Sequence, residues 1–210
     1  MSANAKEQIL QKIRKALTQA TPQPFETEGL PAQAFAPPAT DLDVLFAENF
    51  TAIQGQFSFC VGEQELVGQL ARLAAARKMT KWYCPDERLR ALLQQNGWVQ
   101  PWHPSLPDCH ASLTGAEALV ARTGSILLSS RQAGGRTASI YAPVHICIAY
   151  TTQLVYDISD ALRQMQLKYK NQLPSLISLA SGPSRTADIE KTLVTGVHGP
   201  KEVFCFLVDR

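Results

Sequence analysis

Short apolar segments alternate with amphipathic segments from about residue 41 onward, and this pattern constrains the fold more than any other feature. The spacing of apolar residues predicts helices over residues 41–53, 63–77 and 86–95, and strands over residues 57–61 and 80–84. Strands separated by helices at such short spacing indicate βαβ units. We therefore predict a layered α/β domain built around a largely parallel sheet.

The second half of the chain continues this pattern less regularly. After a tight turn, Thr186 is predicted to start a helix that carries Asp188 and Glu190 in its first turns. Acidic side chains at that position suit the helix dipole. The other predicted elements are strands over residues 125–129, 145–150, 175–180 and 203–208 and a helix over residues 157–166.

Residues 1–40 form a separate region with its own composition. An amphipathic helix is predicted over residues 4–18, and five prolines between residues 21 and 40 exclude both helix and central strand there. The predicted organisation is an N-terminal helix with a proline-rich linker, followed by one domain over residues 41–210. The helix could pack on its own domain or on a partner. Its apolar face consists of Ile9, Leu10, Ile13 and Leu17.

The composition excludes several functional classes. The chain is 45% hydrophobic and 18% charged, with a net charge of +2. This balance fits a globular domain and does not point to nucleic acid or to a membrane surface as a partner. No apolar run reaches the roughly 18 residues of a membrane helix, and the N-terminus lacks the pattern of a signal peptide. We therefore expect a cytoplasmic protein.

The number and spacing of the cysteines indicate whether disulfide bonds or metal sites are expected. The five cysteines are odd in number and widely spaced, which favours a reducing compartment over a disulfide framework. No Cys-x-x-Cys pair occurs, so neither a zinc ribbon nor an iron–sulfur cluster is predicted in this chain. His103, Cys109 and His110 cluster in a proline-rich stretch, but their spacing matches no ligand pattern. We predict no metal site.

The turn from Ser181 to Thr186 is the strongest candidate for a binding site. A tight turn before a helix offers free backbone N–H groups to an anion. Ser181, Gly182 and Ser184 belong to this turn, and Arg185 can grip a phosphate or carboxylate with two parallel hydrogen bonds. In open α/β sheets, ligands gather beyond the carboxyl ends of the strands, where we expect this turn to lie. A purely structural capped turn remains the alternative.

Two further segments could contribute to the same site. Thr123 and Ser125 flank Gly124 just before a predicted strand, where glycine allows a close approach of backbone to a ligand. His198 lies between two glycines in a loop before the last strand, where it could act as a general base or bind a ligand oxygen. Both segments can also be interpreted as purely structural. The first would be a turn that leads into a strand, and the second a loop whose shape is fixed by a hydrogen bond from the imidazole. His145, at the start of a predicted strand, is interpreted as a core histidine.

Four motifs occur in an order that resembles the LUD domain of the lactate-utilisation protein C family. They are Ala-Arg-Thr-Gly-Ser-Ile-Leu-Leu at residues 121–128, Ala-Pro-Val-His-Ile at 142–146, Ser-Gly-Pro-Ser-Arg-Thr-Ala-Asp-Ile-Glu at 181–190 and Gly-Val-His-Gly-Pro-Lys at 196–201. The resemblance covers most of the chain from about residue 41 to the end. One position departs from the family pattern, because Arg122 stands where an acidic residue is usual.

The resemblance implies a three-layer α/β/α sandwich like that of the NagB/RpiA/CoA-transferase group. It also implies an accessory role in oxidising L-lactate to pyruvate, beside partner proteins that carry the iron–sulfur clusters, with no cofactor in this chain. The expected ligand is a small carboxylate or phosphate. Two alternatives remain: an enzyme acting on a phosphorylated or acyl substrate, with Glu117 or His198 as its nucleophile or base, and a metabolite-sensing module.

Overall fold

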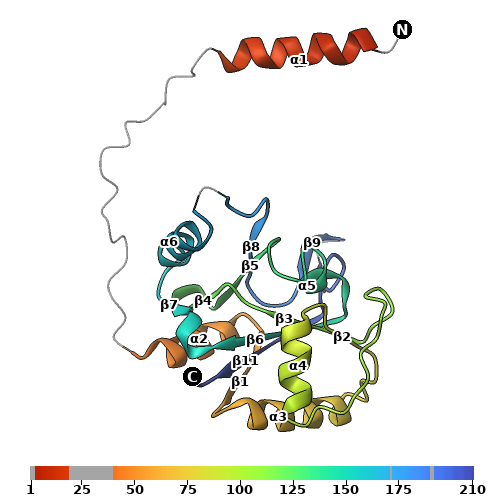
Figure 1. Ribbon diagram of the computed structural model, residues 1–210, viewed down its shortest axis with the longest axis vertical. Helices are drawn as coiled ribbons and strands as arrows, with labels where there is room; N and C mark the ends of the chain where they lie inside the picture. Colours follow the sequence, from red (N-terminus) through yellow and green to blue (C-terminus); the bar gives the residue numbers. More distant parts are fainter. Residues whose placement is uncertain (1–2, 19–39, 171, 190–191) are drawn as a thin grey trace. The chain divides into compact units, whose positions relative to one another are not determined.

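The computed structural model describes residues 3–18, 40–170, 172–189 and 192–210 (Figure 1). The chain divides into two compact units, Met1–Pro37 and Pro38–Arg210. In the first unit, helix α1 (Ala3–Leu17) agrees with the predicted helix, and its four apolar residues are exposed. The proline-rich segment lies outside the described residues except for Thr40.

A five-stranded parallel sheet forms the centre of the second unit, as the alternating pattern predicted (Figure 1). Strand β6 lies in the middle and is buried along nearly its whole length, which explains its continuous apolar sequence. Because all pairs are parallel, the strands share one amino edge and one carboxyl edge. The strand order is β1 (Gln56–Cys60), β11 (Glu202–Val208), β6 (Val144–Tyr150), β3 (Ala111–Gly115) and β2 (Trp82–Tyr83).

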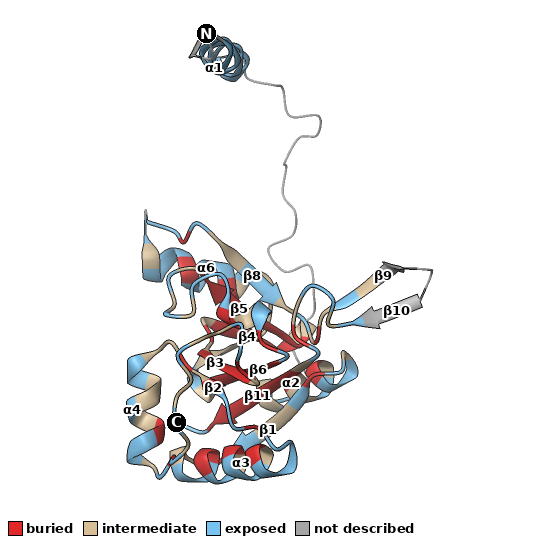
Figure 2. Cartoon of the chain, turned by 90° about the vertical axis from the view of Figure 1, so that its right-hand side faces the viewer, coloured by how far each residue is buried: buried red, intermediate tan, exposed pale blue. Residues whose placement is uncertain are grey.

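Two helices cover one face of this sheet. Helices α3 (Glu63–Ala76) and α4 (Glu87–Gln95) follow β1 and β2, and they bury one apolar face each against the strands (Figure 2). Helix α4 begins after Asp86, whose side chain accepts hydrogen bonds from two backbone N–H groups of the first turn. The core on this side contains Leu66, Leu70, Trp82, Leu93, Trp98, Leu113, Ile146 and Phe206.

Helix α2 (Leu42–Ala52) and a second, four-stranded sheet cover the opposite face. Phe46 and Phe50 of α2 stack on each other, with ring centroids 5.3 Å apart, and are fully buried. Helix α6 (Ile158–Tyr169) packs against the second sheet through Ala161 and Met165. That sheet has the order β7 (Leu154–Val155), β4 (Ala118–Val120), β5 (Ser125–Ser129) and β8 (Ile177–Ala180). The predicted three-layer α/β architecture is confirmed.

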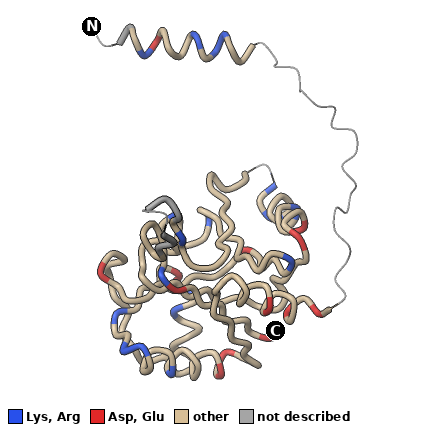
Figure 3. Tube along the Cα trace, turned by 180° about the vertical axis from the view of Figure 1, so that it is seen from behind, with Lys and Arg blue, Asp and Glu red and all other residues tan. Residues whose placement is uncertain are grey.

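The remaining short elements connect these layers. Helix α5 (Ala138–Tyr141) lies between β5 and β6, and two 3₁₀ turns cover Ala121–Thr123 and Thr151–Gln153. None of the described helices is long and apolar enough to cross a membrane. In the described segments no group of three His, Cys, Asp or Glu side chains could hold a metal ion, and all five cysteines are buried free thiols. Basic and acidic residues are interspersed in the view of Figure 3.

The helix predicted to start at Thr186 is wrong. The structure forms an antiparallel hairpin there, made of β9 (Arg185–Ile189) and β10 (Thr192–Thr195). The segment is rich in threonine, isoleucine and valine, whose branched Cβ atoms favour strands, and this preference outweighs the helix-dipole argument. Glu190 lies outside the described residues, as does the side chain of Asp188.

We predict that Gly124→Ala destabilises the protein much more than Gly135→Ala does. Both glycines have a positive φ, at 59° and 57°, so both substitutions carry the same backbone strain. A Cβ at residue 124 would also lie 2.4 Å from the backbone nitrogen of Phe50, whereas a Cβ at residue 135 meets open space. The expected difference in unfolding free energy is at least about 2 kcal/mol by denaturant titration. Equal losses in the two variants would contradict this packing of residue 124 on α2.

Candidate functional site

A cavity of about 390 Å³ opens at the amino edge of the parallel sheet. We call it the amino-edge cavity. Its walls come from β8, α5, the turn after β8, the loop before β11 and the first residues of β6 and β11. Five residues predicted to bind a ligand line it, namely Ser181, Gly182, Ser184, Arg185 and His198. The turn follows the carboxyl end of β8, but it lies at the amino edge of the parallel sheet, so the expected carboxyl-edge location is wrong.

The two glycine-containing motifs are joined around Ser184. Its backbone N–H donates to the carbonyl of Pro200 at 3.0 Å, and its own carbonyl accepts from the N–H of Gly196 at 2.9 Å. A Cβ on Gly199 would lie 2.9 Å from the Cβ of Ser184, so the two loops touch at backbone level. Segments that are separate in sequence therefore form a single wall of the cavity.

The turn after β8 is also fixed to the end of helix α2. Gly182 has a φ of 78°, and a Cβ there would lie 2.3 Å from the carbonyl oxygen of Ile53. The guanidinium of Arg185 donates to the same carbonyl oxygen. Arg185 is exposed, and a guanidinium has five N–H donors, so this bond leaves donors for a ligand. Because a strand replaces the predicted helix, no helix N-terminus begins at Thr186, and the donors at this turn are its side chains and backbone N–H groups.

His145 also lines this cavity, and its role there was missed by the sequence analysis. It is fully buried on β6, and its Nε2 lies 2.9 Å from the hydroxyl of Thr114. Its Nδ1 is buried and has no hydrogen-bond partner among the described residues. Burial lowers the pKa of the imidazole from 6.5 to about 4, so the ring is neutral near pH 7. A buried polar atom left unpaired costs about 1–3 kcal/mol, which favours a hydrogen-bonding ligand or water at Nδ1.

Of the segment around Gly124, one residue reaches the candidate site. The hydroxyl of Ser125 lies 2.7 Å from that of Ser181 and positions it. Thr123 and Gly124 do not line the cavity, and the backbone of Gly124 packs against α2. Thr186 lies in β9 and does not line the cavity either. Arg122 forms a short ion pair with Asp157, the residue that caps helix α6.

Glu117, the other candidate for catalysis, lies in a different cavity from His198. Its carboxylate accepts hydrogen bonds from Ser129 at 2.6 Å, Tyr169 at 2.7 Å and Lys168 at 2.7 Å. Burial tends to raise the pKa of Glu117, but these hydrogen bonds and the charge of Lys168 outweigh it, and the pKa lies below 4.5. Glu117 is therefore an ionised acceptor, and it shares no cavity with His198.

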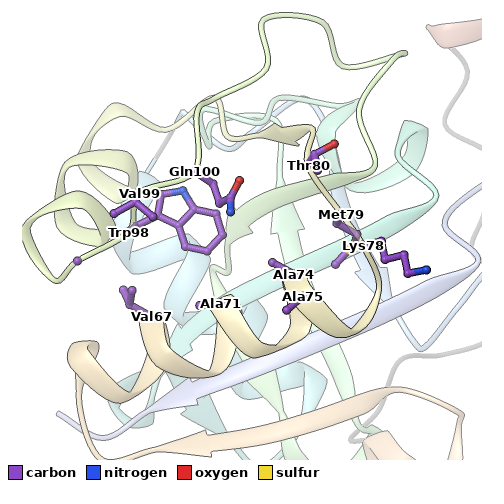
Figure 4. Close-up of a pocket in the computed structure, with 11 residues that line it drawn as sticks. Val67, Ala71, Ala74, Ala75, Lys78, Met79, Thr80, Trp98, Val99 and Gln100 are labelled. Carbon is purple, nitrogen blue, oxygen red and sulfur yellow. The ribbon is translucent and has the colours of Figure 1, made fainter.

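A third cavity, of about 250 Å³, lies between helix α3 and the loop that carries Trp98 (Figure 4). Ala71, Ala74 and Ala75 of α3 form one wall, and the indole of Trp98 lies across from them. Its walls are mainly apolar, and Lys78 is the single charged residue that lines it. It does not suit the small anion expected from the motifs.

The fold and the amino-edge cavity define a layered α/β protein with a pocket formed by the turn after β8 and the loop before β11. A family model described as the LUD domain matches residues 100–208, just over half of the chain, and includes all the candidate residues. The chain belongs to the LUD-domain family. This confirms the family expected from the four motifs.

Individual proteins support the same assignment. An uncharacterized protein of Neisseria meningitidis serogroup B is 39% identical over 137 residues, which are 65% of this chain and 54% of that protein. A lactate utilization protein C of Shouchella clausii is 38% identical over 98 residues, 46% of this chain and 43% of that protein. The chain thus spans about half the length of these relatives. A crystal structure of a DUF162 family protein from Deinococcus radiodurans has a TM-score of 0.59 at 20% identity, covering 81% of this chain and 99% of that one, and shows the shared fold.

We predict that acid destabilises the wild-type protein more than a His145→Asn variant. The folded-state pKa of His145, about 4, lies below the ordinary 6.5, so the unfolded chain takes up the proton more readily. Stability is therefore intact above pH 6.5 and is lost as pH falls toward 4, by about 3 kcal/mol for this group. Urea titrations between pH 4 and 7 measure the difference between the two proteins.

His198→Asn provides the control, because it makes the same substitution at an exposed histidine. The carboxylates with lowered pKa, such as Glu117, are present in all three proteins and cancel in the comparison. If His145→Asn does not fold, NMR titration of the wild-type imidazole measures the pKa directly. An imidazole pKa near 6.5 would contradict the burial argument.

Proposed function

We propose that this chain is an accessory component of an L-lactate oxidation system and binds a small carboxylate or phosphate in the amino-edge cavity. The names of its curated relatives support the lactate-utilisation role. The family resemblance supports partner proteins that carry iron–sulfur clusters and transfer the electrons. In this proposal the chain itself holds no redox group, and it acts by binding an anion and organising its partners.

The observation that carries this proposal is the buried, unpartnered Nδ1 of His145, a residue that lines the cavity formed by the family motifs. A neutral imidazole has one donor and one acceptor nitrogen. When the hydroxyl of Thr114 donates to Nε2, the proton resides on Nδ1, which then donates to an anion in the cavity. Ser181 and Ser184 add hydroxyl donors, and Arg185 adds the positive charge that a carboxylate or phosphate requires.

The alternative of a self-sufficient enzyme gains no support from the placement of its candidate residues. Glu117 and His198 line different cavities, so a reaction at one cavity would use one of them without the other. Turnover of an acyl or phosphorylated substrate by the purified chain would nevertheless favour that alternative. Saturable binding without any partner-dependent effect on lactate oxidation would favour a sensing module.

We predict that Arg185→Ala abolishes complementation of lactate-dependent growth while leaving the fold intact. The host is a deletion strain without a second lactate oxidase, grown on L-lactate as carbon source. Arg185 is exposed, so its removal should change the unfolding free energy by less than about 1 kcal/mol. Loss of a charge-assisted hydrogen bond should weaken binding of L-lactate or inorganic phosphate to the purified chain about tenfold or more, measured by calorimetry.

Arg163→Ala is the matched control, since Arg163 is an exposed arginine on α6 that does not line the cavity. It should complement like the wild type. Normal growth of the deletion strain on L-lactate would contradict a role of this chain in lactate oxidation. Unfolding of Arg185→Ala would instead assign Arg185 a structural role at Ile53 and end the binding interpretation of this residue.

A further inference from the structure

A polar cavity larger than the amino-edge cavity lies at the carboxyl edge of the parallel sheet. It has a volume of about 620 Å³ and adjoins the ends of β2 and β3, the start of α4, the loop after β5 and the end of α6. Carboxyl edges of parallel strands are where open α/β sheets bind ligands. The amino-edge cavity occupies the opposite edge, so this carboxyl-edge cavity is independent of the proposed function.

Each carboxylate that lines the carboxyl-edge cavity has a hydrogen-bond or ion-pair partner. Asp86 accepts from the backbone N–H groups of Arg88 and Leu89, and Glu87 pairs with Arg90 at 3.5 Å. Glu117 pairs with Lys168. These contacts leave the carboxylates charged, so three acidic and three basic side chains balance each other over the wall as a whole, and attraction for an anion is local to cations that have no carboxylate partner.

Two guanidinium groups on that wall lack a carboxylate partner within the described residues. Arg88 lies in the first turn of α4 and Arg131 in the loop after β5, so they reach the cavity from different elements. The guanidinium of Arg131 donates a long hydrogen bond, 3.4 Å, to the carbonyl of Gln172. Each guanidinium can bind a phosphate or a carboxylate through two parallel hydrogen bonds. A dianionic phosphate balances both charges in one group.

Glu117 provides a hydrogen-bond acceptor on the wall of the same cavity. Its side chain is only 2% exposed, and its hydrogen bonds fix Lys168 and Tyr169 at the cavity margin. Two of its three donors bond Oε1, and Lys168 bonds Oε2, which leaves Oε2 able to accept from a ligand hydroxyl. Thr114 and Gln132 add further polar groups. The cavity thus offers cations for an anionic group and acceptors for hydroxyl groups.

We propose that the carboxyl-edge cavity binds a phosphate monoester that carries hydroxyl groups, with the phosphate between Arg88 and Arg131 and a hydroxyl at Glu117. The cavity volume falls in the range of metabolite and cofactor sites and exceeds what a three-carbon acid fills. The ligand is therefore larger than lactate and different from the anion of the amino-edge cavity.

Calorimetric titration of the purified full chain with glycerol 3-phosphate, and separately with inorganic phosphate, tests this site. Arg131→Gln should raise the Kd about tenfold or more, and the Arg88→Gln/Arg131→Gln double variant should remove measurable binding. Arg163→Gln, on the exposed surface of α6, should leave the Kd within about twofold of the wild type. Circular dichroism verifies that each variant is folded. Glycerol 3-phosphate should bind more tightly than inorganic phosphate if its hydroxyls reach Glu117.

Variants of the other cavity separate the two proposals. Ser184→Ala and Arg185→Ala should leave glycerol 3-phosphate binding unchanged, because these residues line the amino-edge cavity. Loss of binding in these variants would place the phosphate there and overturn the present proposal. It is also overturned by the absence of saturable binding up to about 10 mM, or by equal Kd values for wild type and double variant. L-lactate binding that survives in the double variant would leave the proposed function standing.

Discussion

Strand β6 is hydrogen-bonded on both sides, to β11 and β3, and buried on both faces, and the rest of the second unit is arranged around it. Val144, Ile146 and Ile148 face the layer of α3 and α4, while Cys147 and Ala149 face α2 and the second sheet. His145 shares that second face. Its position on β6 buries the imidazole completely. Burial of a charged imidazolium is costly, so the ring is neutral, and its two nitrogens require hydrogen-bond partners.

The Thr114–His145 hydrogen bond connects the walls of two cavities at opposite edges of the sheet. Thr114 lines the carboxyl-edge cavity and His145 lines the amino-edge cavity. They lie on the neighbouring strands β3 and β6, two residues apart in register, and the hydrogen bond joins them diagonally. The hydroxyl and the imidazole each act as donor or acceptor, and the role of one determines the role of the other. A ligand that bonds Nδ1 therefore sets the tautomer of His145 and with it the direction of the Thr114 hydroxyl.

The layered fold could be predicted because burial leaves a clear pattern in the sequence. Strand β5 (Ser125–Ser129) has the predicted bounds, and β6 and β11 differ by one residue, since both are continuous apolar runs that are buried on two faces. The β9–β10 hairpin was missed because its segment has no apolar period, and two acidic residues after a turn favoured a helix. Its site-forming turn was nevertheless found, because Gly182 and the flanking serines mark a tight turn whichever element follows.

The sequence predicted only part of the candidate site, because contacts between segments that are far apart in the chain leave no local sequence pattern. His145 gave one signal, an ionisable residue inside an apolar strand, which fits either a core histidine or a ligand group. Arg122 illustrates the reverse case. The sequence showed its departure from the family pattern but no reason for it, and the structure pairs Arg122 with Asp157 at the start of α6. An acidic residue at 122 would face that carboxylate, so the charge at 122 is matched to the helix cap rather than to either cavity.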